Sequence, residues 1–304
     1  MALFNLNNTN LSQIREKPFK LEKEIQTLIE KNLKLLFNLE FISTEFSIGN
    51  YRFDSLAYDL ESKAFVIIEY KKDKNFSVID QGYAYLSVML NNKAEFILEY
   101  NEKMKKPLDR NSIDWSQSKV LFISPEFTDY QRQSIGFNGL PIELWEIKQY
   151  ENNVVSLNQI KVPKSAESIK KISKSDSLIS QVDKEIIVYD EQHHFEKGSE
   201  KSIELYNELK NSILNIGSNI EIDPKKHYIA FKSLTNFIDV QIQKNGLKCH
   251  LNIRAGELKD PLNKTRNVAN IGHYGNGDYE FNLENSDEIP YLISLVKQAY
   301  EKNK

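Results

Sequence analysis

The spacing of apolar and polar residues changes several times along the first part of the chain. Apolar side chains recur at helical spacing through residues 20–37, whereas apolar and polar residues alternate in 42–48, as in a half-buried strand. Residues 64–70 form a continuous apolar run, which predicts a strand buried on both faces. The full prediction for this region is a helix at 20–37, strands at 42–48, 51–60 and 64–70, a helix at 77–91, strands at 94–100 and 119–124, a helix near 127–135 and a strand at 142–149.

The composition changes after this region. Residues 155–185 are rich in Ser and Lys and poor in large apolar residues, so we expect an exposed linker there, which could include a short helix. Helical spacing returns near 199–215 and 287–302. Between these helices, Asn245-Gly246 separates two apolar segments and is a strong signal for a β-hairpin. The sequence therefore predicts an α/β domain over 1–154, a linker over 155–185 and a smaller α+β domain over 186–304.

The composition restricts the classes of protein to which the chain can belong. It has 304 residues and a net charge of −3, so it is not a globally basic protein that binds nucleic acid through charge alone. Cys249 is the single cysteine, which excludes an intrachain disulfide framework and a cysteine-based zinc site. No apolar run reaches the length of a membrane span, and the first residues lack the pattern of a signal peptide. We therefore expect a cytoplasmic protein with no membrane partner.

Two short segments carry the clearest candidate chemistry: Arg52-Phe53-Asp54 and Ile67-Ile68-Glu69-Tyr70-Lys71. They lie on consecutive predicted strands joined by a turn. A two-residue loop at 61–62 and a four-residue loop at 60–63 give the same register, in which Asp54 lies directly opposite Glu69. A three-residue loop would shift that register by one residue. Two neighbouring carboxylates repel each other unless a cation lies between them.

Strand alternation adds Lys71 to this pair. Glu69 and Lys71 are two residues apart and share one face of the sheet, while the Tyr70 side chain points to the other face. Asp54, Glu69 and the backbone carbonyl of Tyr70 are hard oxygen ligands, which suit Mg²⁺ or Mn²⁺ rather than zinc. Such an ion would neutralise charge on a scissile phosphate, and Lys71 could stabilise the transition state. The alternative is that Glu69 and Lys71 simply mark the point where an apolar strand meets water.

Together with Gln81-Gly82-Tyr83-Ala84-Tyr85 on the next helix, these segments resemble the PD-(D/E)XK nuclease superfamily. The Gln-x-x-x-Tyr spacing is similar to its RecB-like branch. The resemblance covers roughly residues 18–150, with Phe53 in place of Pro before Asp54. It implies a restriction-endonuclease-like αβββαβ core, in which helices flank a mixed sheet. The element order predicted from the apolar pattern agrees with that core.

The resemblance also implies roles for a residue of the first helix. In such nucleases a Glu of this helix often completes the metal site. Glu22 fits the family pattern, as the residue four before Gln26, while Glu24 lies at the opposite edge of the apolar stripe. Glu30 is expected on the far, solvated side. Either Glu22 or Glu24 could instead be a surface charge.

Further residues are implied by the same resemblance or by local charge. Gln81 would orient Lys71 or the substrate, and Tyr85 would contact the phosphate region, with core packing as the alternative for Tyr85. Basic residues expected along a nucleic-acid path are Lys72, Lys74, Lys105 and Lys106.

The sequence therefore predicts a nuclease that depends on Mg²⁺ or Mn²⁺ and hydrolyses phosphodiester bonds, with DNA as the expected nucleic acid and a setting in repair, restriction or phage defence. One alternative is a nuclease fold that binds nucleic acid or another partner without cleaving it. Another is a sensor whose C-terminal domain binds a ligand and gates the nuclease. That domain resembles a domain of unknown function that is sometimes labelled a predicted transport protein. A homodimer is left open.

Overall fold

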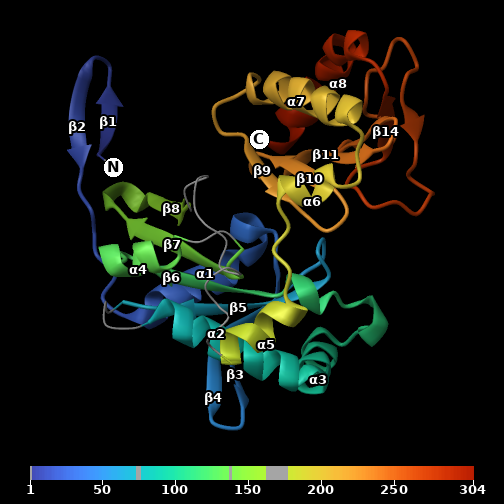
Figure 1. Cartoon of the computed structure of the whole chain (residues 1–304). Helices are drawn as coiled ribbons and strands as arrows, with labels where there is room; N and C mark the ends of the chain where they lie inside the picture. The colour runs from blue at the N-terminus through green and yellow to red at the C-terminus, as the bar shows by residue number, and fades with distance from the viewer. Residues whose placement is uncertain (1, 73–76, 137–138, 162–176) are drawn as a thin grey trace. The chain divides into compact units, whose positions relative to one another are not determined.

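The computed structural model describes residues 2–72, 77–136, 139–161 and 177–304. The chain divides into two compact units, Met1–Val188 and Tyr189–Lys304. Each unit has its own sheet and its own core, and each is described by itself (Figure 1).

A six-stranded mixed sheet forms the centre of the first unit. Its first three strands pair antiparallel, the next two pairings are parallel, and the last strand is antiparallel to its neighbour. In sheet order the strands are β3 (Glu40–Ile48), β4 (Tyr51–Asp59), β5 (Ala64–Tyr70), β6 (Lys119–Ser124), β7 (Ile142–Gln149) and β8 (Val155–Ile160).

Helices cover this sheet, and each face has its own apolar cluster. Strand β5 is buried along its whole length, as its continuous apolar run predicts. On one face, Val66, Ile68 and Tyr70 pack in a cluster with Ile25 and Ile29 of the first helix. On the other face, alternate residues of β5 pack in a larger cluster with α2 and α3. The helices of this unit are α1 (Glu22–Phe37), α2 (Val78–Asn91), α3 (Lys93–Met104), α4 (Asp129–Ser134) and α5 (Ser177–Glu185).

The predicted strand at 94–100 is wrong, because these residues belong to helix α3. The buried side chains of this helix, Phe96 and Tyr100, are four residues apart, which is a helical spacing. A strand would bury Leu98 on the same face as these two, yet 52% of the Leu98 surface is exposed. Among the described residues, two α-helices therefore lie between β5 and β6, and the predicted order α-β-β-β-α-β gains a second α-helix before its last strand.

The expected linker at 155–185 differs from the structure at its start, which is a strand, and its end holds a short helix that packs within the first unit instead of forming an exposed connection. Residues Val155–Ile160 form β8, which pairs with β7. Residues Ser177–Glu185 form α5, which packs against α2 and contributes Val182 to the larger cluster. Residues 162–176 lie outside the described part of the chain. The pattern also missed an N-terminal hairpin made of β1 (Leu3–Asn7) and β2 (Asn10–Ile14).

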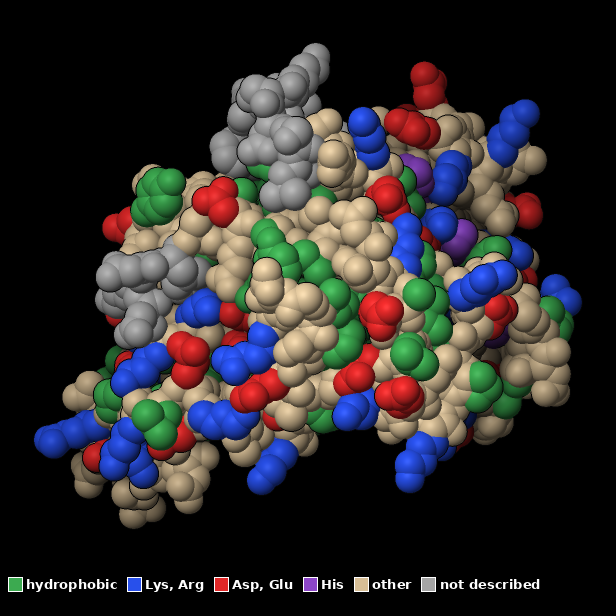
Figure 2. Space-filling view, turned by 90° about the horizontal axis from the view of Figure 1, so that it is seen from below, with side chains coloured by type: hydrophobic (Ala, Val, Ile, Leu, Met, Phe, Trp, Pro, Cys, Tyr) green, Lys and Arg blue, Asp and Glu red, His purple; other side chains and the backbone are tan. Residues whose placement is uncertain are grey.

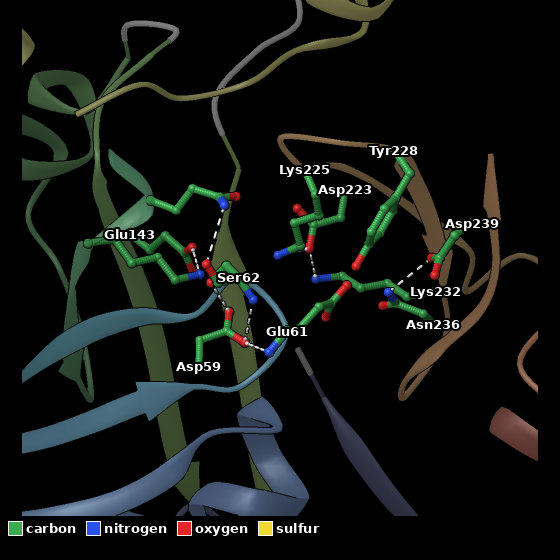
Figure 3. A network of polar contacts seen from close by, with 12 residues as sticks. Asp59, Glu61, Ser62, Glu143, Asp223, Lys225, Tyr228, Lys232, Asn236 and Asp239 are labelled. Atoms are coloured by element: carbon green, nitrogen blue, oxygen red, sulfur yellow. Dashed lines mark hydrogen bonds and ion pairs between the residues drawn. The ribbon is translucent and has the colours of Figure 1, made fainter. Parts of the chain in front are cut away.

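The turn between β4 and β5 sets the register of the two strands that carry the candidate site. Pairing runs from Asp59↔Ala64 to Ser55↔Ile68, so the loop has the four residues 60–63. The Asp59 carboxylate accepts hydrogen bonds from the backbone N–H groups of Glu61 and Ser62 at 2.9 and 3.3 Å, and from the Ser62 hydroxyl at 2.7 Å (Figure 3). The register predicted from the sequence is confirmed.

The second unit is an antiparallel sheet with two long helices on one face (Figure 1). The predicted hairpin is confirmed, because β11 and β12 pair with Gln243 opposite Gly246. Beside it, the buried Asp239 carboxylate accepts a hydrogen bond from Asn236 at 3.1 Å (Figure 3). The elements are α6 (Glu191–Phe195), α7 (Glu200–Leu214), β9 (Glu221–Pro224), β10 (Ile229–Lys232), β11 (Asn236–Gln243), β12 (Gly246–Leu251), β13 (Arg266–Asn267), β14 (Tyr279–Leu283) and α8 (Ile289–Asn303).

Replacing Asp59 with Ala tests the turn. The change removes three hydrogen bonds that a buried carboxylate accepts, so we expect the free energy of unfolding of the first unit to fall by about 1–3 kcal/mol. Both tryptophans, Trp115 and Trp145, lie in this unit, so tryptophan fluorescence during urea unfolding reports on it alone. The control is Leu60→Ala in the same turn, where 46% of the side chain is exposed and a change below about 0.5 kcal/mol is expected. Equal stability of the two variants would contradict this role.

Candidate active site

The candidate site lies where β4 and β5 separate. Regular pairing ends at Ser55↔Ile68, and the next residues along the two strands are Asp54 and Glu69. The Lys71 backbone N–H donates to Ile123 of β6, so the preceding N–H, that of Tyr70, faces β4. It donates to Asp54 Oδ2 at 2.9 Å. A carboxylate thus replaces a backbone carbonyl as the acceptor, and this contact holds Asp54 beside the end of β5.

The Glu69 carboxylate is the most buried polar group of the site, with 4% of the residue exposed. Its Oε1 atom accepts three hydrogen bonds: from Lys71 Nζ at 2.7 Å, from Gln81 Nε2 at 2.9 Å and from the Tyr85 hydroxyl at 3.2 Å. Its Oε2 atom is also buried, but has no hydrogen-bond partner among the described residues. One oxygen is therefore saturated, whereas the other is an acceptor without a donor.

The environment of Asp54 raises the pKa of its carboxyl group. Burial, with repulsion from Glu69, raises the pKa of Asp54 from 3.8 to about 6. The Tyr70 N–H and the Lys71 ammonium oppose that shift, and Glu22 adds to it. Because burial and the neighbouring carboxylates both disfavour the ionised form of Asp54, a cation bound there would lower the free energy of the ionised site.

Helix α2 contributes Gln81 and Tyr85 from its first turns. The helix begins after Ser77, whose side chain accepts a hydrogen bond from the Asp80 N–H. The two residues are spaced i, i+4, and Gln81 Nε2 donates to the Tyr85 hydroxyl at 2.7 Å as well as to Glu69. The Tyr85 ring packs edge-on against Phe53, with ring centroids 4.9 Å apart. Tyr85 therefore combines a core ring with a hydroxyl at the site.

Helix α1 contributes Glu22 rather than Glu24. The Glu22 carboxylate accepts a hydrogen bond from the Lys72 N–H at 2.8 Å, just beyond β5. Glu24 instead accepts from the Lys20 N–H at the start of its own helix. The expectation that Glu30 lies on the solvated side is wrong. Glu30 is half-buried and accepts from Ser55 Oγ at 2.6 Å, because the stripe formed by every fourth residue from Glu22 faces β4.

The basic candidates separate into two groups. Lys71 lies at the site, and Lys72 is exposed next to it, with its ammonium on the Lys20 carbonyl at 2.6 Å. Lys74 lies outside the described residues. Lys105 and Lys106 follow α3, and Lys106 Nζ lies 3.9 Å from Glu40. Glu40 pairs with Tyr58, roughly 13 Å along the strands from the site at about 3.3 Å per residue, so the structure does not bring this pair to Glu69.

The arrangement of donor atoms fits a hard divalent cation that keeps part of its water shell. Among the described residues, no group of three or more His, Cys, Asp or Glu side chains is arranged to hold a metal ion. Mg²⁺, however, is commonly bound through one or two carboxylates, with water and substrate phosphate completing its shell. Asp54 and the unpartnered Oε2 of Glu69 provide such a pair. The Tyr70 carbonyl and Glu22 are further candidate ligands.

The surface does not add a broad basic face on the side seen in Figure 2. Lys and Arg side chains of the described residues there alternate with Asp and Glu. Among the described residues, no helix combines the length and apolar character needed to cross a membrane.

Two comparisons with other proteins cover different shares of the chain. A family model described as "Domain of unknown function (DUF5655)" matches residues 191–303, which lie in the second unit. The expected domain of unknown function is thereby confirmed. An uncharacterized protein of Haemophilus influenzae (strain ATCC 51907 / DSM 11121 / KW20 / Rd) is 50% identical over 299 residues, which are 98% of this chain and 99% of that protein.

Solved structures similar to part of the chain include a repair endonuclease from Pyrococcus abyssi, with 16% identity and a TM-score of 0.26 over 43% of this chain and 49% of that one. Others are an EndoMS–dsDNA2 complex, with 13% identity and a TM-score of 0.23, and EndoMS in apo form, with 12% identity and a TM-score of 0.25. Each is matched over 44% of this chain. The chain covers 60% and 58% of those two chains, so it spans only about half the length of these proteins. Likeness at such TM-scores decides neither fold nor activity.

The pKa of Asp54 predicts how the stability of the metal-free protein depends on pH. The folded-state pKa of about 6 exceeds the unfolded value of 3.8, so the folded state binds more protons between these values. The free energy of unfolding should therefore fall as pH rises from about 4 to 6. Asp54→Asn removes this effect, and should be more stable than the natural protein at pH 7.5 by about 1–2 kcal/mol after solvent screening.

Urea unfolding in EDTA at several pH values, followed by tryptophan fluorescence, measures this difference. The stability gap between the two proteins should close as pH approaches 4. Glu24→Gln, on the same unit but away from the site, should keep the natural profile. Parallel profiles for Asp54→Asn and the natural protein would contradict the assignment.

Proposed function

The chain belongs to the same family as the Haemophilus influenzae protein, and from the geometry of its site we propose that it is a divalent-metal-dependent nuclease of the PD-(D/E)XK type. The observation that carries the proposal is the unequal hydrogen bonding of the two Glu69 carboxylate oxygens. The Oε1 atom accepts from Lys71, Gln81 and Tyr85, while the buried Oε2 atom has no hydrogen-bond partner in the part of the chain that the structure describes. Hydrogen bonds among protein groups leave that atom unused, which suits a metal ligand.

The order of elements supports the same proposal. The first helix is followed by β3, β4 and β5, then by helices, and then by β6, which is parallel to β5. The residues of the resembled motifs lie on the corresponding elements: Asp54 on β4, Glu69 at the end of β5, and Gln81 and Tyr85 on α2. We infer a restriction-endonuclease-like core from this order together with the motifs.

Each residue of the site has a distinct proposed role in phosphodiester hydrolysis. Asp54 and Glu69 would hold Mg²⁺ or Mn²⁺, which would neutralise phosphate charge and lower the pKa of a bound water. Lys71 keeps its ammonium 2.7 Å from Glu69, where it can stabilise negative charge developing on the phosphate. Gln81 bonds Glu69 and Tyr85, so its role is to fix the Glu69 carboxylate.

DNA is the proposed substrate class, as the resemblance of the motifs implies. The second unit would recognise the substrate or mediate assembly, including a homodimer. A role in repair, restriction or phage defence would follow from such an activity. The alternative, in which the protein binds nucleic acid without cleaving it, predicts the same fold. Binding alone, however, requires neither an unpartnered carboxylate oxygen nor a lysine next to it.

Cleavage assays test the proposal directly. The full chain should cleave at least one of single-stranded DNA, duplex DNA or RNA with Mg²⁺ or Mn²⁺, and should not cleave in EDTA. Asp54→Asn and Lys71→Met should each lower the rate constant for cleavage by about 100-fold or more, because each removes a charge at the reacting phosphate. Lys103→Met, an exposed lysine on α3, is the matched control and should retain activity. Binding without cleavage under every condition would favour the alternative.

A second pair of variants separates Glu22 from Glu24. Glu22→Gln keeps an oxygen that can accept from the Lys72 N–H but loses the charge next to Asp54. We expect it to lower cleavage at limiting Mg²⁺ by about tenfold or more. Glu24→Gln, on the other edge of the same helix, should stay within about twofold. Equal rates for the two variants would exclude Glu22 from the metal site.

A further inference from the structure

A polar network lies beneath the site, on the face of β4 and β5 that packs against α1. Its central residue is Gln26, of which 5% is exposed. The Gln26 side-chain amide lies 2.9 Å from each of three acceptors: the Asp54 carbonyl, Glu30 Oε1 and Thr44 Oγ1. The sequence signal for this group is a polar stripe at every fourth residue of α1, Glu22, Gln26 and Glu30, beside the apolar stripe.

The Asp54 carbonyl needs such a donor because strand pairing is interrupted opposite it. Backbone groups alternate along a strand, so the carbonyl of Asp54 faces β3 when its neighbours face β5. The pairs on either side are Thr44↔Ser55 and Phe46↔Phe53. The residue between them on β3, Glu45, has a φ of 52°, which a regular strand does not allow. A buried carbonyl without a donor is costly, and the Gln26 amide supplies the donor.

The orientation of the Gln26 amide is fixed by its surroundings. Its NH₂ group faces the Glu30 carboxylate and the Asp54 carbonyl, which only accept hydrogen bonds. Its oxygen accepts from Lys23 Nζ at 3.1 Å. Rotating the amide by 180° would place oxygen against two acceptors, so one orientation is strongly preferred.

Ser55 ties the same network to β5. Ser55 is fully buried, and its hydroxyl donates to Glu30 Oε1 at 2.6 Å. The Tyr70 hydroxyl lies 3.1 Å from Ser55 Oγ and completes the link between the strands. Ser55 follows Asp54, and Tyr70 follows Glu69, so each residue of the carboxylate pair has its next neighbour anchored on the reverse face.

We propose that Gln26 is a positioning residue for the metal site. It fixes the backbone of Asp54 from the reverse face, and thereby fixes where the Asp54 carboxylate meets Glu69. This inference rests on the proposed nuclease function. The inference goes beyond that function, because it states that a residue on the reverse face of the sheet fixes the geometry of the carboxylate pair.

The test compares a variant that removes the Gln26 amide group with a variant that removes only one of its acceptors. Gln26→Met keeps the length of the side chain but loses the donor to Asp54. Thr44→Val removes another acceptor of the same amide, has nearly the same shape, and leaves the Gln26 amide able to donate to the Asp54 carbonyl. Both are made in the full chain, and cleavage is measured as a function of Mg²⁺ concentration. Direct Mn²⁺ binding is measured by calorimetry in parallel.

We expect Gln26→Met to raise the half-saturating Mg²⁺ concentration and the Mn²⁺ dissociation constant by about tenfold or more, as loss of a residue that orients a metal ligand does. Its rate at saturating Mg²⁺ should stay within about threefold of the natural protein. Thr44→Val should shift neither concentration by more than about twofold. A metal requirement that is unchanged in Gln26→Met would overturn the inference, whether or not the rate falls, since a purely structural defect lowers the rate equally at every Mg²⁺ concentration.

The two measurements keep this inference separate from the proposed function. If the natural protein binds Mn²⁺ but cleaves nothing, the nuclease proposal fails, and the Mn²⁺ affinities of the two variants still decide the role of Gln26. If the natural protein cleaves and Gln26→Met has the same metal requirement, the inference fails while the nuclease proposal stands.

Discussion

The burial of the Glu69 carboxylate is the constraint on which the site depends. A carboxylate at the end of a buried strand costs free energy unless donors replace the water that it loses. Lys71, Gln81 and Tyr85 provide those donors to one oxygen. The two contacts from Gln81 and Tyr85 also join the end of β5 to the first turns of α2. The second oxygen is buried and has no hydrogen-bond partner among the described residues, and the charge of Glu69 helps to raise the pKa of Asp54.

Different interactions on the two faces of the β4–β5 pair hold this arrangement in place. On the α2 face, charge and hydrogen bonds converge on Glu69. On the α1 face, Gln26, Ser55 and Glu30 form a network that reaches the backbone beneath the site. The interruption of β3 at Glu45 matters here, because a regular ladder would satisfy the Asp54 carbonyl and leave Gln26 with no role there. At Asp54, helix α1 therefore supplies the hydrogen bond that the neighbouring strand does not, while β3 pairs with β4 on both sides of this position.

Both ends of the segment that resembles a linker in composition belong to the first unit. Strand β8 extends the sheet, and α5 packs on α2, the helix that carries Gln81 and Tyr85. The Tyr83 hydroxyl donates to Asp183 of α5 at 3.1 Å. The helix that shapes one side of the site is therefore itself supported by a segment far along the chain. Composition alone hides this, because few large side chains, such as Val182 and Ile186, are enough to dock a short helix.

The sequence by itself determined the features that depend on local pattern. The apolar run of β5, the turn at 60–63 and strand alternation together predicted that Asp54 lies across from Glu69 with Lys71 on the same face, because register follows from loop length and period. Tertiary packing decided the rest. It made 94–100 a helix by burying Phe96 and Tyr100 together, and it turned Glu30 inward. It also placed Glu22 rather than Glu24 beside the site, and Gln26 against the Asp54 carbonyl. These outcomes depend on which strand a helix face packs against, and the spacing of residues within one helix does not contain that information.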